Sequence, residues 1–161
     1  MPLTAEVIKP VITKEEIRQQ MIAYALRWVG TPYEHLGRQV GVRGDCISAL
    51  VDVAAHFGVA DNPRQSIGVN QYSRVPNPRV MRECIEQHMN PIHKKDAIPG
   101  DWFHIAWRIH PQHMALYTHN KYNNIFVLHA SSFTMKYVLE QMDSELWSQI
   151  VTAYRFKLLC N

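Results

Sequence analysis

The stretch Asp45-Cys46-Ile47-Ser48-Ala49-Leu50-Val51, which continues to Phe57 and Gly58, decides the fold of this chain. Its apolar residues recur at intervals of three and four, the spacing of one face of an α-helix. These residues are Ile47, Leu50, Val51, Ala54 and Phe57. Gly58 is placed to end the helix. The pattern predicts a buried helix from residue 46, with Cys46 at its N-terminus.

A glycine-rich loop precedes this helix, and another helix precedes the loop. Residues 13–16, Thr-Lys-Glu-Glu, have the spacing of a capping box, and apolar residues follow at helical intervals as far as Gly30. These signals predict a helix over residues 13–29 and a loop over residues 30–45. Residues 1–12, which contain two prolines, are predicted to form an extended arm.

The second half of the chain changes in character. Prolines interrupt residues 59–99, where the pattern leaves room for short helices at 66–74 and 78–89. After Asp101 the pattern becomes that of β-strands. The predicted strands are 102–107, 113–118, 125–130 and 150–156. Helices followed by strands predict an α+β fold, and no linker divides residues 13–161, which we expect to form a single domain.

Composition narrows the classes of partner. With 161 residues, 47% of them hydrophobic, the chain is long enough to bury a core without disulfides. The net charge is only +3 and the basic residues are scattered, so we predict no nucleic-acid partner. No stretch is both uncharged and long enough to cross a bilayer, so no membrane partner is predicted. The first residues lack a secretory-signal pattern, and a target outside the cytoplasm would require delivery by other machinery.

Cys46 is the candidate nucleophile. A thiol is weak until it ionises, and the unpaired N–H groups and positive dipole end of a helix N-terminus favour the thiolate. The same N–H groups could bind the oxyanion of a tetrahedral intermediate. The alternative is that Cys46 is a small buried residue at the start of a helix. Its neighbours, Asp45 and the glycine-rich loop downstream of Tyr33, favour the functional interpretation.

Strand geometry selects two of the nine histidines as partners. His113 opens the strand HMALYT, and His129 lies near the end of NIFVLHA. If these strands are neighbours, one imidazole could act as base toward the thiol while the other fixes its tautomer. The alternative is that both are ordinary half-exposed strand histidines. The cysteines are three and widely spaced, and no Cys or His pairs stand at zinc spacing, so neither a metal nor a cofactor is predicted.

Five blocks of sequence, taken in order, resemble the signature of NlpC-type peptidases. They are Gly30–Tyr33, Asp45–Leu50, Pro99–Phe103, His113–Tyr117 and Leu128–Ala130, which together span nearly the whole chain. The sequence departs from the family's pattern in two places. The family usually has Cys-Ser-Gly-Leu where this chain has Cys46-Ile47-Ser48-Ala49-Leu50, and only Gly37 remains of the usual pair of glycines after the tyrosine.

The resemblance implies a papain-like fold in which the cysteine-bearing helix packs on a C-terminal antiparallel β-sheet. It implies that Cys46 is the nucleophile, His113 the general base and His129 the residue that orients His113. The residues implied to contact the substrate are Tyr33, Asp45 and Ser48. The implied reaction is hydrolysis of amide bonds in peptidoglycan stem peptides, often between D-glutamate and the diamino acid, without a cofactor.

Short phage-encoded members of this type, which accompany tail assembly, are the most similar, and Ala153–Phe156 resembles their closing strand. The resemblance thus implies an enzyme made in the cytoplasm and carried by a virion to the periplasm or cell wall. Two alternatives remain open. One is an amidase effector delivered by type VI secretion machinery, and the other is a catalytically silent structural tail component with the same fold.

Overall fold

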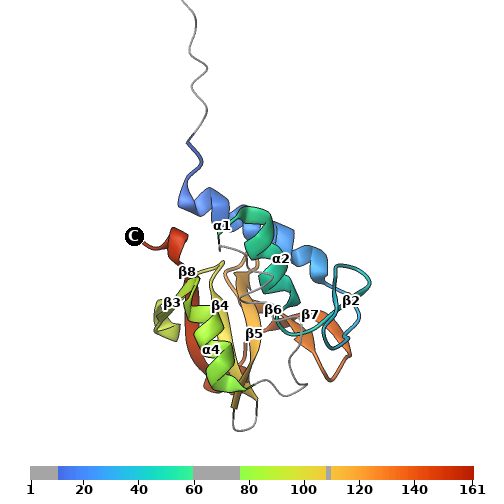
Figure 1. Cartoon of the computed structure of the whole chain (residues 1–161). Coiled ribbons are helices and arrows are strands. Elements are labelled where there is room, and N and C mark those ends of the chain that lie inside the picture. Colours follow the sequence, from blue (N-terminus) through green and yellow to red (C-terminus); the bar gives the residue numbers. More distant parts are fainter. Residues whose placement is uncertain (1–10, 60–76, 108–109) are drawn as a thin grey trace, which may run out of the picture.

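The computed structural model describes residues 11–59, 77–107 and 110–161. It has an α+β fold in which helices come first and a six-stranded antiparallel sheet follows (Figure 1). The strand order across the sheet is β3-β8-β4-β5-β6-β7. The predicted fold class is therefore confirmed. The predicted helix at 66–74 and most of the predicted arm lie outside the described residues.

The sequence predicts the four inner strands and misses the two at the edges. The strands are β3 (Met89–Ile92), β4 (Trp102–Trp107), β5 (His110–His119), β6 (Ile125–Ser131), β7 (Lys136–Gln141) and β8 (Ile150–Phe156). Pro91 lies in β3, where its missing N–H costs little because an edge strand has a neighbour on one side only.

The first helix, α1 (Lys14–Ala25), begins as predicted. The Thr13 side chain accepts the Glu16 N–H while Glu16 accepts the Thr13 N–H, so the capping box is present. The chain continues as a 3₁₀ turn over Leu26–Trp28. Together these two elements occupy nearly the whole predicted span.

The other helices depart from prediction in their bounds. Helix α2 (Ser48–Phe57) begins two residues later than predicted and ends at Gly58, which has a left-handed φ of 59°. Helix α4 (Pro78–Glu86) ends three residues before the predicted boundary, because the chain must turn into β3. Helix α5 (Ser144–Gln149), capped by the Asp143 side chain, was not predicted because six residues are too few to show a helical period.

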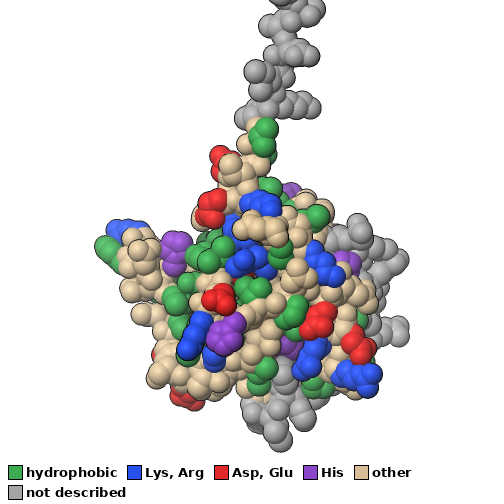
Figure 2. Space-filling view, turned by 90° about the vertical axis from the view of Figure 1, so that its left-hand side faces the viewer, with side chains coloured by type: hydrophobic (Ala, Val, Ile, Leu, Met, Phe, Trp, Pro, Cys, Tyr) green, Lys and Arg blue, Asp and Glu red, His purple; other side chains and the backbone are tan. Residues whose placement is uncertain are grey.

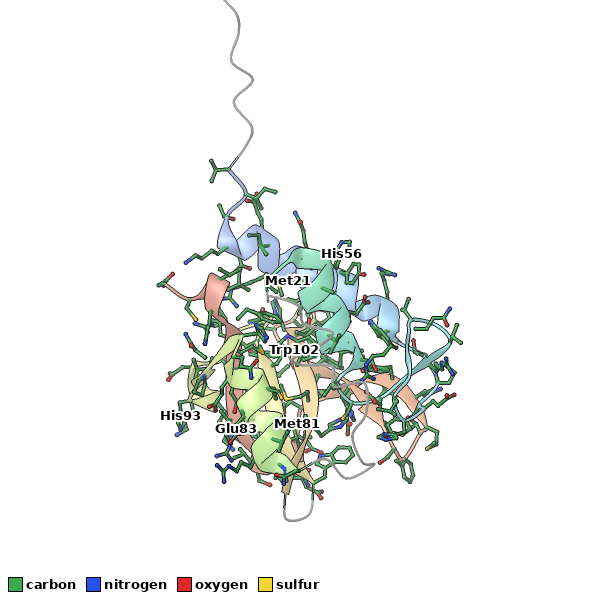
Figure 3. All side chains as sticks on the ribbon, viewed as in Figure 1. Met21, His56, Met81, Glu83, His93 and Trp102 are labelled. Carbon is green, nitrogen blue, oxygen red and sulfur yellow. The ribbon has the colours of Figure 1, made fainter. Side chains whose placement is uncertain are left out.

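Helices α1, α2 and α4 cover one face of the sheet (Figure 1). Met21 of α1 and Trp102 of β4 are buried in this core, and Met81 of α4 packs against it (Figure 3). The opposite face carries a smaller core around Phe103 and Ile105, which α5 covers with Leu146. Because side chains alternate along a strand, His113, which pairs with Ile105, belongs to this second face.

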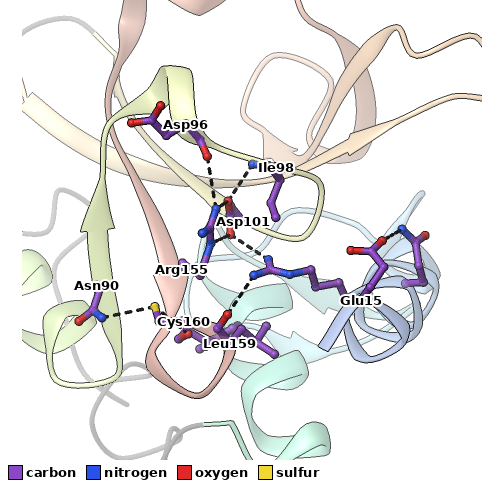
Figure 4. A network of polar contacts seen from close by, with 11 residues as sticks. Glu15, Asn90, Asp96, Ile98, Asp101, Arg155, Leu159 and Cys160 are labelled. Atoms are coloured by element: carbon purple, nitrogen blue, oxygen red, sulfur yellow. Dashed lines mark hydrogen bonds and ion pairs between the residues drawn. The ribbon is translucent and has the colours of Figure 1, made fainter. Parts of the chain in front are cut away.

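A buried carboxylate ties the helices to the sheet (Figure 4). Asp101 receives Arg18 of α1 at 3.1 Å and Arg155 of β8 at 2.8 and 3.0 Å. It also accepts the Ile98 N–H at 2.8 Å. Arg18 goes on to bind the Leu159 carbonyl near the C-terminus at 3.2 Å. Three segments that are distant in sequence are thus joined, namely α1, the turn at 98–101, and β8 with the C-terminus.

The loop before α2 lies against the outer edge of β7. Tyr137 of β7 exchanges backbone hydrogen bonds with Gly30 and Thr31, both at 2.8 Å. The loop then forms a small hairpin of β1 (Arg38–Gln39) and β2 (Arg43–Gly44). A Cβ on Gly44 would lie 2.5 Å from the Trp28 ring, so this close approach requires glycine. The chain leaves this hairpin directly into Asp45 and Cys46.

Among the described residues, no helix is both long and apolar enough to cross a membrane. Figure 2 shows the face over β3 and β8, where Lys and Arg side chains are interspersed with Asp and Glu. That face therefore carries charges of both signs.

Candidate active site

Cys46 lies in a turn before α2, because the helix begins at Ser48 with Ile47 as its N-cap. The prediction that Cys46 opens the helix is wrong by two residues. Asp45 causes the difference: its carboxylate accepts the Ile47 N–H at 3.3 Å and its carbonyl accepts the Ser48 N–H at 3.2 Å. These bonds close a turn that orients the chain before helical geometry starts.

Asp45 and Ser48 are buried and engaged within the chain. The Asp45 carboxylate, 1% exposed, accepts Arg38 Nη1 at 2.7 Å and the Leu36 N–H at 2.9 Å. The Ser48 hydroxyl donates to the Gly37 carbonyl at 2.6 Å and accepts the Asp45 N–H at 2.8 Å. In this arrangement both side chains shape the turn, and their implied contact with a substrate stays a prediction.

Tyr137 clamps the same turn from the sheet. Its hydroxyl donates to the Asp45 carbonyl and accepts the Ala49 N–H at 3.1 Å, so it holds the chain on both sides of Cys46. The side chain is buried. Sequence reasoning missed this residue because β7 reads KYVLEQ, in which polar residues dilute the strand pattern. An aromatic side chain with a polar tip between two turn signals was the available clue.

The environment of Cys46 keeps its thiol protonated. Burial and the neighbouring Asp45 carboxylate raise the pKa of Cys46 to about 12, against opposing effects from Arg38 and from the Cys46 N–H. The expected stabilisation of a thiolate by a helix N-terminus is therefore not what the resting site provides. The physical reason is burial of the thiol together with the negative charge of Asp45 next to it.

His113 and His129 form a hydrogen-bonded pair. His113 Nε2 lies 2.8 Å from His129 Nδ1, and the two rings are nearly perpendicular, at 89°. Antiparallel pairing of β5 with β6 makes this possible, because the two histidines lie on the same face of neighbouring strands. Trp107 of β4 stacks on the His113 ring with centroids 4.8 Å apart. The imidazole of His113 is therefore fixed from two sides.

Glu140 extends the pair into a chain of three. Its Oε2 lies 2.7 Å from His129 Nε2. Glu140 comes from β7, where it pairs across the sheet with Val127 and so shares the face of His129. Sequence reasoning missed this residue for the same reason that it missed Tyr137, since β7 was not recognised as a strand.

Both histidines favour the neutral form. Burial lowers the pKa of His113 well below 6.5, and the neighbouring His129 lowers it further. Burial also lowers the pKa of His129, while Glu140 opposes that shift. At neutral pH each ring thus carries one proton, and the other nitrogen of each ring can accept a hydrogen bond.

The remaining sequence candidate, Tyr33, lies on the same edge as the clamp. Its N–H donates to the Met135 carbonyl at 2.8 Å, and it bridges to Gly44 in the adjacent segment. The loop carrying Cys46 and the histidine chain therefore both make contacts with β7, through Tyr137 and Glu140. Across residues 11–59, 77–107 and 110–161, no group of three or more His, Cys, Asp and Glu side chains is arranged to hold a metal ion.

This fold also occurs in a solved structure that matches nearly the whole chain. A Staphylococcus aureus subsp. aureus Mu50 protein, described as similar to a lipoprotein of the NLP/P60 family, matches with a TM-score of 0.57 and 19% identity. The match covers 94% of this chain and 45% of that one, so this chain spans less than half of its length. The predicted arrangement of N-terminal helices and an antiparallel sheet is thus confirmed as an NLP/P60-like fold. No family model and no curated protein matches the sequence.

Proposed function

We propose that the chain is a cysteine hydrolase that cleaves amide bonds in peptidoglycan stem peptides. The observation that carries the proposal is the hydrogen-bonded pair of His113 and His129, held at 2.8 Å on a fold shared with an NLP/P60 family protein. The proposal also requires the Cys46 thiol to reach His113. Here the turn with Cys46 is clamped to the next strand, β7, by the Tyr137 hydroxyl.

The proposed reaction is acyl transfer through Cys46. His113 takes the thiol proton as sulfur attacks the stem-peptide carbonyl, and it then protonates the leaving amine. Water, activated by the same imidazole, releases the acyl group. Since the pKa of the thiol is about 12 and His113 is neutral, the proton moves during attack instead of before it. The proposed resting state is therefore a neutral thiol beside a neutral imidazole.

The N–H groups at the start of α2 limit where an oxyanion can bind. The N–H groups of Ile47, Ser48 and Ala49 donate to Asp45 and Tyr137. The Cys46 N–H lowers the pKa of the thiol. We propose that the Cys46 N–H, the backbone donor of the nucleophile itself, contributes to oxyanion binding.

Two finer parts of the proposal rest on the sequence resemblance. The bond between D-glutamate and the diamino acid is the proposed target, with Tyr33, Asp45 and Ser48 near the substrate. Delivery by a phage tail remains a prediction, as does the alternative of a type VI secreted effector.

The test is mass spectrometry of muropeptides released from purified sacculi. We expect new fragments ending at a stem-peptide amide with the wild-type chain and none with Cys46→Ala. The matched control is Cys84→Ala, which removes a thiol of α4 and should leave cleavage unchanged. The fragment masses identify the bond. Equal release by Cys46→Ala would overturn the proposal, and no release by any variant would favour the silent structural role.

A further inference from the structure

Three side chains from three neighbouring strands form a continuous hydrogen-bonded series. His113 of β5 contacts His129 of β6 at 2.8 Å, and His129 contacts Glu140 of β7 at 2.7 Å. The histidines are 7% and 1% exposed, whereas the Glu140 side chain is 49% exposed. A charged group at the edge of the sheet is thus connected through two buried rings to the proposed base.

The direction of each hydrogen bond follows from what a carboxylate can do. A carboxylate only accepts, so the proton between Glu140 and His129 must sit on His129 Nε2. In a neutral His129, Nδ1 is then an acceptor, and His113 must donate to it from Nε2. The opposite direction would leave His129 Nε2 without a proton and facing carboxylate oxygen at 2.7 Å, two acceptors in contact.

We propose that Glu140 is a positioning residue that sets the tautomer of His113 through His129, leaving His113 Nδ1 as the nitrogen that accepts the Cys46 proton. This inference rests on the proposed function for its catalytic meaning, but the tautomers themselves can be measured without any reaction. After His113 takes the proton, its Nε2–H still points to His129, and the carboxylate stabilises the positive charge through that ring.

Without Glu140, the donor and acceptor in the hydrogen bond between His113 and His129 should no longer be fixed. With Glu140→Ala, His129 can hold its proton on either nitrogen, and a proton on Nδ1 would force His113 to accept at Nε2. His113 would then carry its own proton on Nδ1, the nitrogen needed to take up the thiol proton. With Glu140→Gln, the amide oxygen can still accept from His129 Nε2, so the wild-type tautomers should persist.

The experiment is nitrogen NMR of the full chain labelled with ¹⁵N-histidine, with signals assigned by His113→Gln and His129→Gln. In the wild type, we expect both rings protonated at Nε2. Glu140→Ala should give His113 a measurable Nδ1–H population, and Glu140→Gln should restore the wild-type spectrum. Glu145→Gln, an exposed carboxylate of α5, is the matched control and should change nothing. A wild-type His113 protonated at Nδ1, or an unchanged spectrum in Glu140→Ala, would overturn the proposal.

A second measurement separates this inference from the proposed function. On sacculi, we expect Glu140→Ala to lower kcat by about tenfold or more, up to the roughly 10²–10⁴-fold that a general base contributes, with KM unchanged. Glu140→Gln should recover most of that loss, which a purely structural role would not predict. If the wild type fails to hydrolyse sacculi, the proposed function fails, while the spectra alone still decide the role of Glu140. A KM effect with normal kcat would overturn that role.

Discussion

Among the described residues, two buried aspartates each bind arginine, and they have different structural roles. Asp101 is fully buried and joins Arg18, 83 residues away, with Arg155, 54 residues away. Asp45 is equally buried, but its arginine, Arg38, is only seven residues away and 26% exposed. The first aspartate connects distant elements, whereas the second shapes one turn.

The number of residues between each aspartate and its arginine separates the two roles. A carboxylate that binds distant residues supports the fold, and one that binds a neighbour shapes the candidate active site. Asp101 compensates two arginines at the junction of α1, β8 and the C-terminus. Asp45 sits beside Cys46 and raises the pKa of its thiol. We therefore expect loss of Asp101 to affect folding, and loss of Asp45 to affect mainly the chemistry of the cysteine.

The largest expected effect is that of Asp101→Asn on stability. The amide keeps the shape but removes the carboxylate that Arg18 and Arg155 share, and breaking a buried ion pair costs about 3–5 kcal/mol. Urea unfolding should show this loss as a lower midpoint with an unchanged slope. Glu83→Gln breaks an arginine pair of similar length, 2.9 Å, that is exposed, and should change stability far less because exposed ion pairs contribute little. Equal effects of the two changes would refute the comparison.

Asp45→Asn should be milder for the fold and larger for the thiol. Arg38 is partly exposed and can be solvated, so we expect a loss of about 1–3 kcal/mol, the cost of an imperfectly satisfied buried polar group. Removing the negative charge should lower the pKa of Cys46 from about 12, and each unit raises the thiolate fraction about tenfold. Alkylation rates of Cys46 across alkaline pH measure the shift.

The control for that measurement is Glu34→Gln in the same loop. Glu34 pairs with Arg43 at 3.1 Å, but both side chains are more than half exposed. It should leave the alkylation profile of Cys46 unchanged. A profile of Asp45→Asn identical to that of the wild type would show that Asp45 does not set the pKa of the thiol.

The distance in sequence between contacting residues also explains which features could be predicted from sequence. Helix α1 and strands β4, β5, β6 and β8 follow from local periodicity and capping, signals that the residues themselves contain. His113 and His129 could be paired by assuming that their strands are neighbours, and the structure brings their rings together. That assumption needed only two long apolar strands in succession.

Features that depend on β7 could not be predicted. Its six residues include three polar ones on the exposed edge, so neither Tyr137 nor Glu140 carries a recognisable strand signal. The start of α2 was misplaced because Asp45 closes a turn before it, and Tyr137 clamps that turn through residues 88 and 92 positions away. The ionisation of Cys46 depends on that turn, and local helix rules gave it the wrong direction.

The smallest expected effect concerns the pH dependence of stability, to which the histidine pair should contribute and the Asp101 cluster should not. His113 and His129 belong to the site, and their pKa values are lowered from 6.5 in the folded chain. The unfolded chain therefore binds protons more strongly as the pH falls below 6.5, so stability should decrease toward acid pH. The slope reaches at most about 1.4 kcal/mol per pH unit for each histidine that titrates.

Urea unfolding of single variants between pH 7 and 5 measures this contribution. His129→Gln should flatten the acid slope because it removes one titrating group and relieves the pair. His119→Gln, an exposed residue of the same strand as His113, should keep the wild-type slope. In Asp101→Asn the midpoint should fall at every pH while the slope between pH 7 and 5 stays that of the wild type. If His129→Gln kept the full slope, the acid sensitivity would arise outside the histidine pair, and the two regions would not differ in this respect.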